Sequence, residues 1–370
     1  MNSKPIVDLE PTIQDHIREE APERCPELLS ASARERALER SFLGLYKWYI
    51  DRSQRSRLYS PDRSFSWSKF RKDHSPEVLR ILEGFYAVEQ FNPDVTGNIT
   101  HVVRDSYGRG GFQVSWGSEE MRHSDLWRNC LLASGQRSLE WIEDYTDTLR
   151  RNEWTVPWED PTRMLLYQVV QERATQLNYL HTCLIAKGEK RTTSHAPDVD
   201  PVLAEVARVI AIDEAAHYNF FLEGARLLFY YKPEETAQAL IDVFRFYAMP
   251  GRDLVPDYAG FARTLSECGV FNVRQHYVVD TLQLILDNLG VDNLAALDEG
   301  IKRCRLVPDV DGKLRETTLF ESLQYGKIED SVKNLARRIN AYEDESGAAC
   351  LHRTEFVPNP NVPGRPRAEE

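Results

Sequence analysis

The sequence predicts an all-α protein built around a bundle of four long helices. Apolar residues recur at helical spacing through most of the 370 residues, and no alternating pattern typical of a strand extends beyond a few positions. Two of the predicted helices, 162–187 and 200–231, are unusually long and follow each other closely. Long neighbouring helices joined by a short connection are what an antiparallel four-helix bundle requires.

The other helices are expected at intervals along the chain, separated by residues that interrupt helices. Their expected ranges are 33–50, 76–92, 116–133, 136–151, 233–247, 258–269, 274–289, 294–304 and 327–343. Several interruptions coincide with proline or glycine, as at Ser134-Gly135, Asp160-Pro161 and Pro250-Gly251, because neither residue suits a helix interior. These additional helices are expected to elaborate the four-helix core.

The two ends of the chain differ from this helical body. Residues 1–30 contain several prolines and little periodicity, and we expect them to form an N-terminal extension. Residues 354–370 are rich in proline, and we expect this tail to be disordered. Residues 31–353 are therefore predicted to form a single helical domain.

Composition excludes several classes of protein. No apolar run approaches the roughly 18 residues that a membrane-spanning helix needs, and the first residues lack the apolar segment of a secretory signal. We therefore expect a cytoplasmic protein with no membrane partner. The net charge of −12 disfavours binding to nucleic acid. None of the six cysteines forms a Cys-x-x-Cys pair, which argues against a zinc ribbon or a disulfide framework.

A basic stretch contrasts with this acidic background. Between Arg52 and Lys72, lysine and arginine recur while Asp62 is the only acidic residue. Such a stretch is either a solvated loop or a docking surface for an acidic partner. The sequence leaves both interpretations open.

Two short segments carry residues suited to metal chemistry. Glu120 and His123 form a Glu-x-x-His pair within a predicted helix, and Glu214 and His217 form a second pair within another. Residues three positions apart lie on one face of a helix, so each pair presents a carboxylate and an imidazole to the same point. One such pair arises by chance in a chain of this length, but two on long helices are a more specific signal.

Each pair follows a glutamate that lies in an apolar helical segment. Glu89 precedes the first pair and Glu172 precedes the second. A carboxylate among apolar residues is unfavourable unless it is paired or binds a metal. Two-metal sites in four-helix bundles use two such glutamates beside two Glu-x-x-His pairs, and this oxygen-rich set suits iron or manganese. The predicted metal ligands are therefore Glu89, Glu120, His123, Glu172, Glu214 and His217.

The residues beside these ligands are expected to have supporting roles or none. Glu119 and Asp213 directly precede a ligand, and each is expected either to orient a histidine or to be solvated. The remaining histidines lack partners at ligand spacing, so no metal role is predicted for His16, His74, His101, His181, His195, His276 and His352.

The segments around the ligands resemble those of the acyl-acyl-carrier-protein desaturases. EEMRH followed by SDL is similar to the EENRHGDLL of that family, QERAT matches its counterpart, and DEAAH resembles DEKRHE. Glu89 with Pro93 is similar to the EEALP of the family, and Met249-Pro250 follows the second long helix as expected. Over about residues 80–250 the chain is thus similar to a ferritin-like di-iron family, of which it resembles a divergent member.

The resemblance implies an activity and a set of partners. It implies an oxidoreductase in which two iron ions, cycling between Fe2+ and Fe3+, use O2 to introduce a double bond into an acyl chain carried on acyl carrier protein. The electrons are expected from a donor such as ferredoxin, and the protein is expected to form a homodimer. The resemblance also implies that Thr175, on the same helix as Glu172, is a catalytic residue beside the metals. As a plain sequence feature, Thr175 is equally well a packing residue.

Departures from the family keep other interpretations open. Ala215 and Ala216 replace a lysine and an arginine of the family motif, which weakens the usual basic docking surface for the carrier. We expect the Arg52–Lys72 stretch to replace it. One alternative is a di-iron oxygenase of natural-product metabolism that hydroxylates or N-oxygenates, although the additional histidine ligand usual in such sites is not evident. Iron storage or ferroxidase activity is a weaker alternative, because a bare bundle needs far fewer than 370 residues.

Overall fold

The computed structural model describes residues 31–189, 198–303, 322–354 and 356–358. The all-α prediction is confirmed: within these ranges the regular structure is helical, apart from an isolated β-bridge between Val291 and Leu323. The N-terminal extension and nearly all of the proline-rich tail lie outside the described residues, so the structure does not test the predicted domain boundaries. Also outside them lie Cys25, Cys304, His16 and His195.

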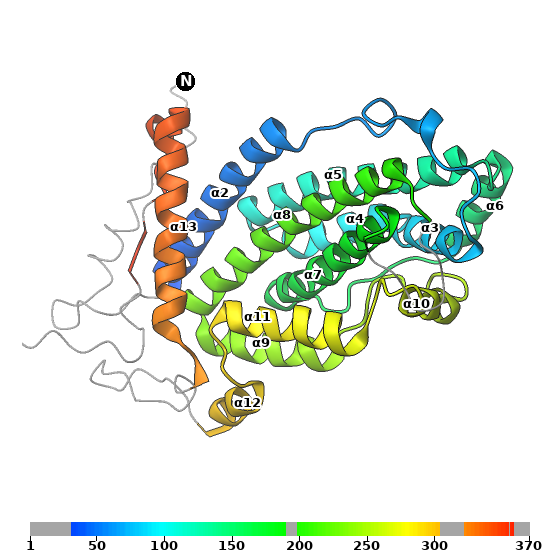
Figure 1. Ribbon diagram of the computed structural model, residues 1–370. Coiled ribbons are helices and arrows are strands. Elements are labelled where there is room, and N and C mark those ends of the chain that lie inside the picture. Colours follow the sequence, from blue (N-terminus) through cyan, green and yellow to red (C-terminus); the bar gives the residue numbers. More distant parts are fainter. Residues whose placement is uncertain (1–30, 190–197, 304–321, 355, 359–370) are drawn as a thin grey trace, which may run out of the picture.

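Four long helices form the central bundle. They are α3 (Pro76–Glu89), α5 (Tyr107–Ser134), α7 (Pro161–Ala186) and α8 (Pro201–Tyr231). α7 and α8 pack against each other along much of their length, and α3 packs against α5 (Figure 1). A further long helix, α2 (Ala31–Ser56), lies against α5 and α8. The two longest predicted helices thus lie side by side as the sequence pattern indicated.

Local sequence signals explain where three of the four bundle helices begin. The side chains of Ser75, Asp160 and Asp200 each accept a hydrogen bond from a backbone N–H in the first turn of the helix that follows. Each of these residues directly precedes a proline, whose missing N–H is not needed at the first helical position. These caps define where the helices that carry four of the six predicted ligands begin.

Two helical segments were missing from the sequence prediction. The structure has a helix α4 (Asn92–Val102), and α5 begins nine residues before the predicted 116, at Tyr107. Several glycines lie in α5, and they allow close packing against neighbouring helices. A Cβ atom at Gly108 would lie 2.5 Å from the backbone of Phe42, and one at Gly117 would lie 2.3 Å from the side chain of Thr96. Tertiary contact therefore outweighs the low helix propensity of glycine here.

The remaining helices surround the bundle. They are α6 (Leu139–Leu149), α9 (Pro233–Phe246), α10 (Tyr258–Glu267), a π-helix (Val273–Gln283), α11 (Leu284–Leu289), α12 (Leu294–Arg303) and α13 (Tyr325–Ser346). α13 stands beside α2 at one end of the molecule, whereas α6 and α10 lie near α3 at the other (Figure 1). None of the helices in the described ranges is both long and apolar enough to cross a membrane.

Two buried apolar clusters fill the interior on either side of a polar centre. One contains Phe112 and Trp116 of α5, and the other contains Phe85, Trp127 and Tyr179. Aromatic rings pack closely within the second cluster, where the centroids of Phe85 and Tyr179 lie 4.9 Å apart. The bundle thereby encloses its polar centre in large apolar side chains that exclude water.

Candidate metal centre

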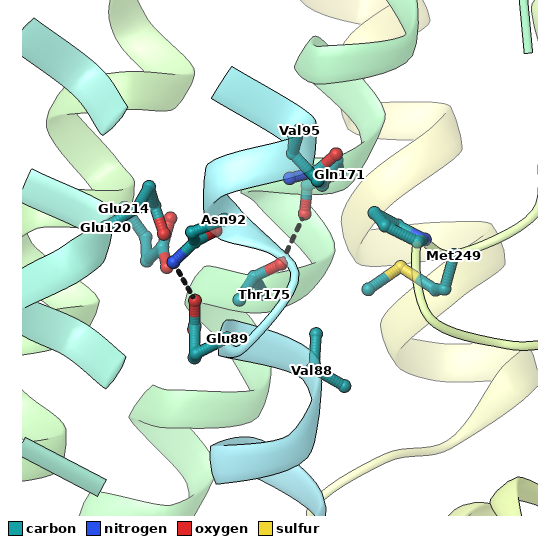
Figure 2. A pocket seen from close by; sticks show the side chains of 10 residues that line it. Val88, Glu89, Asn92, Val95, Glu120, Gln171, Thr175, Glu214 and Met249 are labelled. Atoms are coloured by element: carbon teal, nitrogen blue, oxygen red, sulfur yellow. Dashed lines mark hydrogen bonds between the residues drawn. The ribbon is translucent and has the colours of Figure 1, made fainter. Parts of the chain in front are cut away.

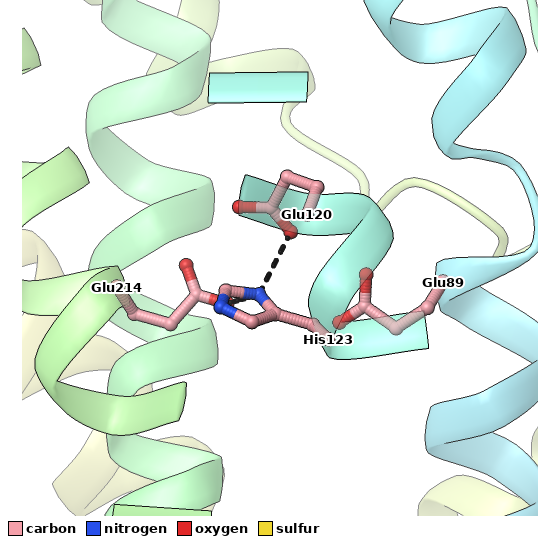
Figure 3. Close-up of side chains that lie close together, drawn as sticks. All are labelled: Glu89, Glu120, His123 and Glu214. Atoms are coloured by element: carbon pink, nitrogen blue, oxygen red, sulfur yellow. Dashed lines mark hydrogen bonds and ion pairs between the residues drawn. The ribbon is translucent and has the colours of Figure 1, made fainter. Parts of the chain in front are cut away.

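The bundle brings the predicted ligands together from all four of its helices. The ligand atoms form two groups within which all atoms lie no more than 4.8 Å apart. The first group, shown in Figure 3, consists of Glu89, Glu120, His123 and Glu214. The second group consists of Glu120, Glu172, Glu214 and His217. Every one of these side chains is buried. Elsewhere in the described ranges no third cluster of this kind occurs, and no other histidine belongs to one.

Two of the carboxylates belong to both groups. Glu120 and Glu214 are shared, while Glu89 and Glu172 each belong to one group only. Because the two groups adjoin and share these carboxylates, the arrangement would suit two adjacent cation positions, with Glu89 and Glu172 each contributing to one of them. The sequence predicted the residues, but only the structure shows which of them the two groups share.

Glu89 and Glu172, which belong to one group each, are held by side chains that sequence reasoning did not identify. Asn92 Nδ2 donates a hydrogen bond to Glu89 Oε2 at 3.0 Å, and the Tyr179 hydroxyl donates one to the other carboxylate oxygen. Trp116 Nε1 donates to Glu172 Oε1 at 3.1 Å. Helical spacing was a signal only for Trp116, which lies four residues before Glu120 and therefore on the same face of α5, since Glu89 ends α3 and Asn92 begins α4.

The electrostatics of the cluster indicate a site for cations. Burial, together with the charge of Glu120, raises the pKa of Glu89 to about 7. Burial and the neighbouring Glu120 and Glu172 also raise the pKa of Glu214 well above its usual range. Glu120 differs, because His123 and His217 outweigh its burial and lower its pKa to about 2. Glu89 and Glu214 are thus less well stabilised as anions than they are in water, and the oxygen-rich set of four carboxylates fits two divalent metal ions.

The two histidines each face the cluster with one ring nitrogen. His123 Nδ1 lies 3.2 Å from Glu120 Oε2, and His217 Nδ1 lies 3.0 Å from Glu120 Oε1. The opposite nitrogen of each ring contacts an acid outside the cluster. His123 Nε2 lies 3.2 Å from Asp213 Oδ2, and His217 Nε2 lies 2.9 Å from Glu119 Oε2. Glu119 and Asp213 therefore orient the imidazoles, as expected, and leave Nδ1 to face the cation positions.

A pocket opens beside the carboxylates (Figure 2). Glu89, Glu120 and Glu214 contribute to its wall, and the rest of the lining consists of Val88, Asn92, Val95, Gln171, Thr175, Met249 and Pro250. The hydroxyl of Thr175 donates to the backbone oxygen of Gln171 at 2.8 Å. The structure thus places Thr175 on the pocket wall, where the resemblance implied it would lie, although its catalytic role remains a prediction.

The basic side chains of the Arg52–Lys72 stretch do not all lie free on one exposed surface. The side chain of Arg57 is only 10% exposed, and its Nη1 lies 3.0 Å from Glu119 Oε2 and 2.7 Å from Asp213 Oδ1. Arg71 is also engaged, with Asp73 and Asp198. The prediction that this stretch docks an acidic carrier is therefore wrong for Arg57, whose charge is taken up by buried carboxylates.

Comparison with known proteins identifies the family. Residues 97–317, more than half of the chain, match the family model described as fatty acid desaturase. The chain belongs to the fatty acid desaturase family. The matched range contains five of the six predicted ligands, and Glu89 lies just before it. The resemblance seen in the sequence motifs is thereby confirmed.

Curated members of this family share about half of their length with the chain. An acyl-[acyl-carrier-protein] desaturase 4 of Oryza sativa subsp. japonica is 32% identical over 220 residues, which cover 54% of this chain and 50% of the rice protein. A stearoyl-[acyl-carrier-protein] 9-desaturase of Olea europaea is 27% identical over 208 residues, covering 53% and 50% respectively. Both names carry the description chloroplastic.

Two solved structures show a more distant similarity. The acyl-ACP desaturase DesA2 of Mycobacterium tuberculosis is 18% identical, covers 68% of this chain and 93% of its own, and superposes with a TM-score of 0.49. An R2-like ligand-binding oxidase with a Mn/Fe cofactor is 16% identical, covers 66% of this chain and 92% of its own, and has a TM-score of 0.47.

Proposed function

We propose that this chain is an O2-dependent di-iron oxidoreductase that introduces a double bond into an acyl chain carried on acyl carrier protein. The observation that carries the proposal is the buried cluster with two adjacent cation positions, which opens onto a pocket. Membership of the fatty acid desaturase family supports the reaction class, and relatives that match half of their length are named acyl-carrier-protein desaturases.

Iron at both positions is part of this proposal, with ligands Glu89, Glu120, His123, Glu172, Glu214 and His217. Four carboxylates would balance the charge of two divalent ions, and the two neutral imidazoles complete the set. When bound, the metals would activate O2 and supply the oxidising power that removes two hydrogens from the acyl chain, with two electrons from a donor such as ferredoxin.

The protein's own side chains hold the ligands and position the substrate. Asn92 and Tyr179 fix the carboxylate of Glu89, so its oxygens keep a defined direction at the edge of the pocket. Val88, Val95 and Met249 offer apolar contacts to a methylene chain lying beside the carboxylates. Buried aromatic rings around the cluster exclude water, which strengthens every electrostatic interaction inside.

Thr175 is proposed as the catalytic residue next to the metals. Thr175 lines the pocket about one helical turn from Glu172, and its hydroxyl donates to the Gln171 backbone oxygen. A hydroxyl in this position can hold or transfer a proton beside the reacting carbon.

Turnover of defined substrates tests the proposed reaction. The purified, iron-loaded protein is supplied with acyl-carrier-protein substrates of several chain lengths, O2 and a ferredoxin reducing system, and the acyl products are analysed by mass. Loss of two hydrogens supports desaturation. Gain of one oxygen atom instead supports the alternative of a di-iron oxygenase. Iron bound without any oxidised product supports storage or ferroxidase activity.

The proposal also includes the oligomeric state and the cellular location of the protein. A homodimer is expected, and light scattering at several protein concentrations measures whether the mass is twice that of one chain. Fluorescence imaging of a tagged chain in its host tests the expected cytoplasmic location. A monomer, or a location within an organelle, would leave the proposed chemistry intact and change only these two points.

A further inference from the structure

One face of α2 is directed at the outer side of the metal centre. Tyr49, Ser53 and Arg57 are spaced four residues apart at the C-terminal end of this helix and just beyond it, so they lie on one face. The hydroxyl of Tyr49 donates to Glu119 Oε2 at 2.8 Å, and Ser53 donates to the other oxygen of Glu119. The guanidinium of Arg57 lies over the ring of Tyr49, with its centre 5.0 Å from the ring centroid.

A single nitrogen of Arg57 joins the two acids that orient the histidines. Its Nη1 donates to Glu119 Oε2 at 3.0 Å and to Asp213 Oδ1 at 2.7 Å. Glu119 contacts His217, and Asp213 contacts His123. The result is a continuous chain of contacts from one imidazole to the other, with the guanidinium at its middle.

We propose that Arg57 is a positioning residue that holds both histidine-bearing halves of the metal centre in register. It acts through Glu119 and Asp213 and contacts none of the predicted ligands itself. This inference rests on the proposed metal centre but assigns a role to a residue outside the ligand set. It also gives a structural reason for a cation at this point in the basic stretch.

The physical basis is the cost of bringing two buried carboxylates together. The side chains of Glu119 and Asp213 are 4% and 1% exposed, so water does little to screen their mutual repulsion. Arg57 offsets that repulsion and fixes where both acids sit. Because each acid fixes the ring of one histidine, displacement of Arg57 is transmitted to both Nδ1 atoms.

A purely electrostatic role of Arg57 and a positioning role predict opposite effects of its removal on metal affinity. If the guanidinium acted only as a positive charge near two metal cations, its removal would relieve repulsion and tighten metal binding. If it acts by position, its removal weakens binding at both positions, because neither imidazole keeps its direction. The substitution Arg57→Lys separates the two roles further, since lysine keeps the positive charge. Its nitrogen lies one bond nearer the backbone than Nη1, and the side chain lacks the planar group that lies over Tyr49.

Titration of the metal-free protein with Co2+ provides the test, by calorimetry and by the visible spectrum of bound cobalt. We compare the wild type with Arg57→Lys and Arg57→Met, and with Arg55→Met as a matched control. Arg55 lies in the last turn of α2, two residues before Arg57, but its side chain is 61% exposed and pairs with Asp51 and Glu345. We expect both Arg57 variants to weaken both cobalt positions by about 10- to 100-fold, and the control to match the wild type.

Variants of the two acids sharpen the result. Glu119→Gln and Asp213→Asn should each weaken mainly the position of its own histidine, whereas the Arg57 variants should change the spectrum and affinity of both. Thermal melting shows whether each metal-free variant is folded. If Arg57→Met does not fold, Arg57→Lys alone decides the question by the same measurement.

The possible outcomes separate this inference from the proposed function. A wild type that does not take up two cobalt ions contradicts the metal centre itself. Normal uptake by the wild type, with unchanged or tighter binding in Arg57→Lys and Arg57→Met, overturns the positioning role and leaves the metal centre standing.

Discussion

Asp213 and Glu214 are neighbours in the sequence, yet their pKa values shift in opposite directions in the structure. Glu119 precedes Glu120 and Asp213 precedes Glu214, and all four side chains are buried. Burial and nearby carboxylates raise the pKa of Glu214. For Asp213 burial acts in the same direction, but the hydrogen bond and charge of His123, and then the charge of Arg57, lower its pKa below the usual range.

The difference shows two ways of burying an acid. The outer pair, Glu119 and Asp213, is complete within the protein, because Arg57 and the histidines supply opposite charge and hydrogen bonds. The inner cluster is not complete, since burial and neighbouring carboxylates raise the pKa values of Glu89 and Glu214. An inner site of this kind gains stability from cations that the chain itself does not supply.

The largest expected effect comes from removing an inner carboxylate. Glu172→Ala and Glu214→Ala should each reduce desaturation to background and weaken metal binding by more than the 10- to 100-fold typical of outer partners. The metal-free variants should be as stable as the wild type or more stable, because a repulsive buried charge is lost. Iron quantitation, activity and thermal melting measure these effects, with the exposed Glu205 on α8 as the matched control, Glu205→Ala. Full activity with stoichiometric iron would refute the ligand assignment.

Removal of an outer carboxylate should have the opposite effect on the stability of the metal-free protein. Asp213→Asn removes an ionic partner of Arg57 and His123, so we expect the free energy of unfolding to fall by about 1–3 kcal/mol. Metal affinity should fall by about 10- to 100-fold, less than for an inner ligand. Chemical denaturation and metal titration measure both quantities. Stabilisation of the metal-free protein by Asp213→Asn would contradict the contrast between the two pairs.

The stability of the metal-free protein should depend on pH through the inner cluster. Glu89 has a pKa of about 7 in the folded state instead of 4.5, so the folded state binds its proton more tightly than the unfolded state. The associated stability is present below pH 4.5 and is lost as the pH rises through 7. The raised pKa values of His123 and His217 act in the same direction.

Denaturation of the metal-free protein at pH 5.5 and 7.5 measures this dependence. We expect the wild type to be more stable at the lower pH, and Glu89→Gln to show a smaller difference because one titrating group is gone. An identical pH dependence in the wild type and the variant would exclude Glu89 as a contributor.

The smallest expected effect on stability and metal binding is that of Thr175→Val. The substitution keeps the shape of the side chain and removes a hydroxyl that donates to the Gln171 backbone, so the free energy of unfolding should change by about 1 kcal/mol or less. Metal content should be unchanged, since Thr175 belongs to neither ligand group. Slower product formation at full iron content would support its catalytic role, whereas wild-type kinetics would indicate a packing residue.

The sequence by itself determined the helical bundle and the members of the inner cluster. Helical periodicity and the Ser-Pro and Asp-Pro starts define the long helices, and the three-residue spacing of each Glu-x-x-His pair is a local property of a helix. Glu89 and Glu172 were recognisable because a lone carboxylate in an apolar helical segment needs a partner. Such features depend on neighbours in the chain, so they could be predicted.

Only the tertiary structure decided what lies across from each helix. The first turns of α5 were not predicted, yet Gly108 lies within this helix, where the backbone of Phe42 approaches too closely for a side chain. Arg57 read as part of a basic surface, yet it lies between Glu119 and Asp213, which are distant in the sequence. The physical reason is the same in both cases: the free energy of a glycine contact or a buried ion pair depends on a partner that only folding brings near.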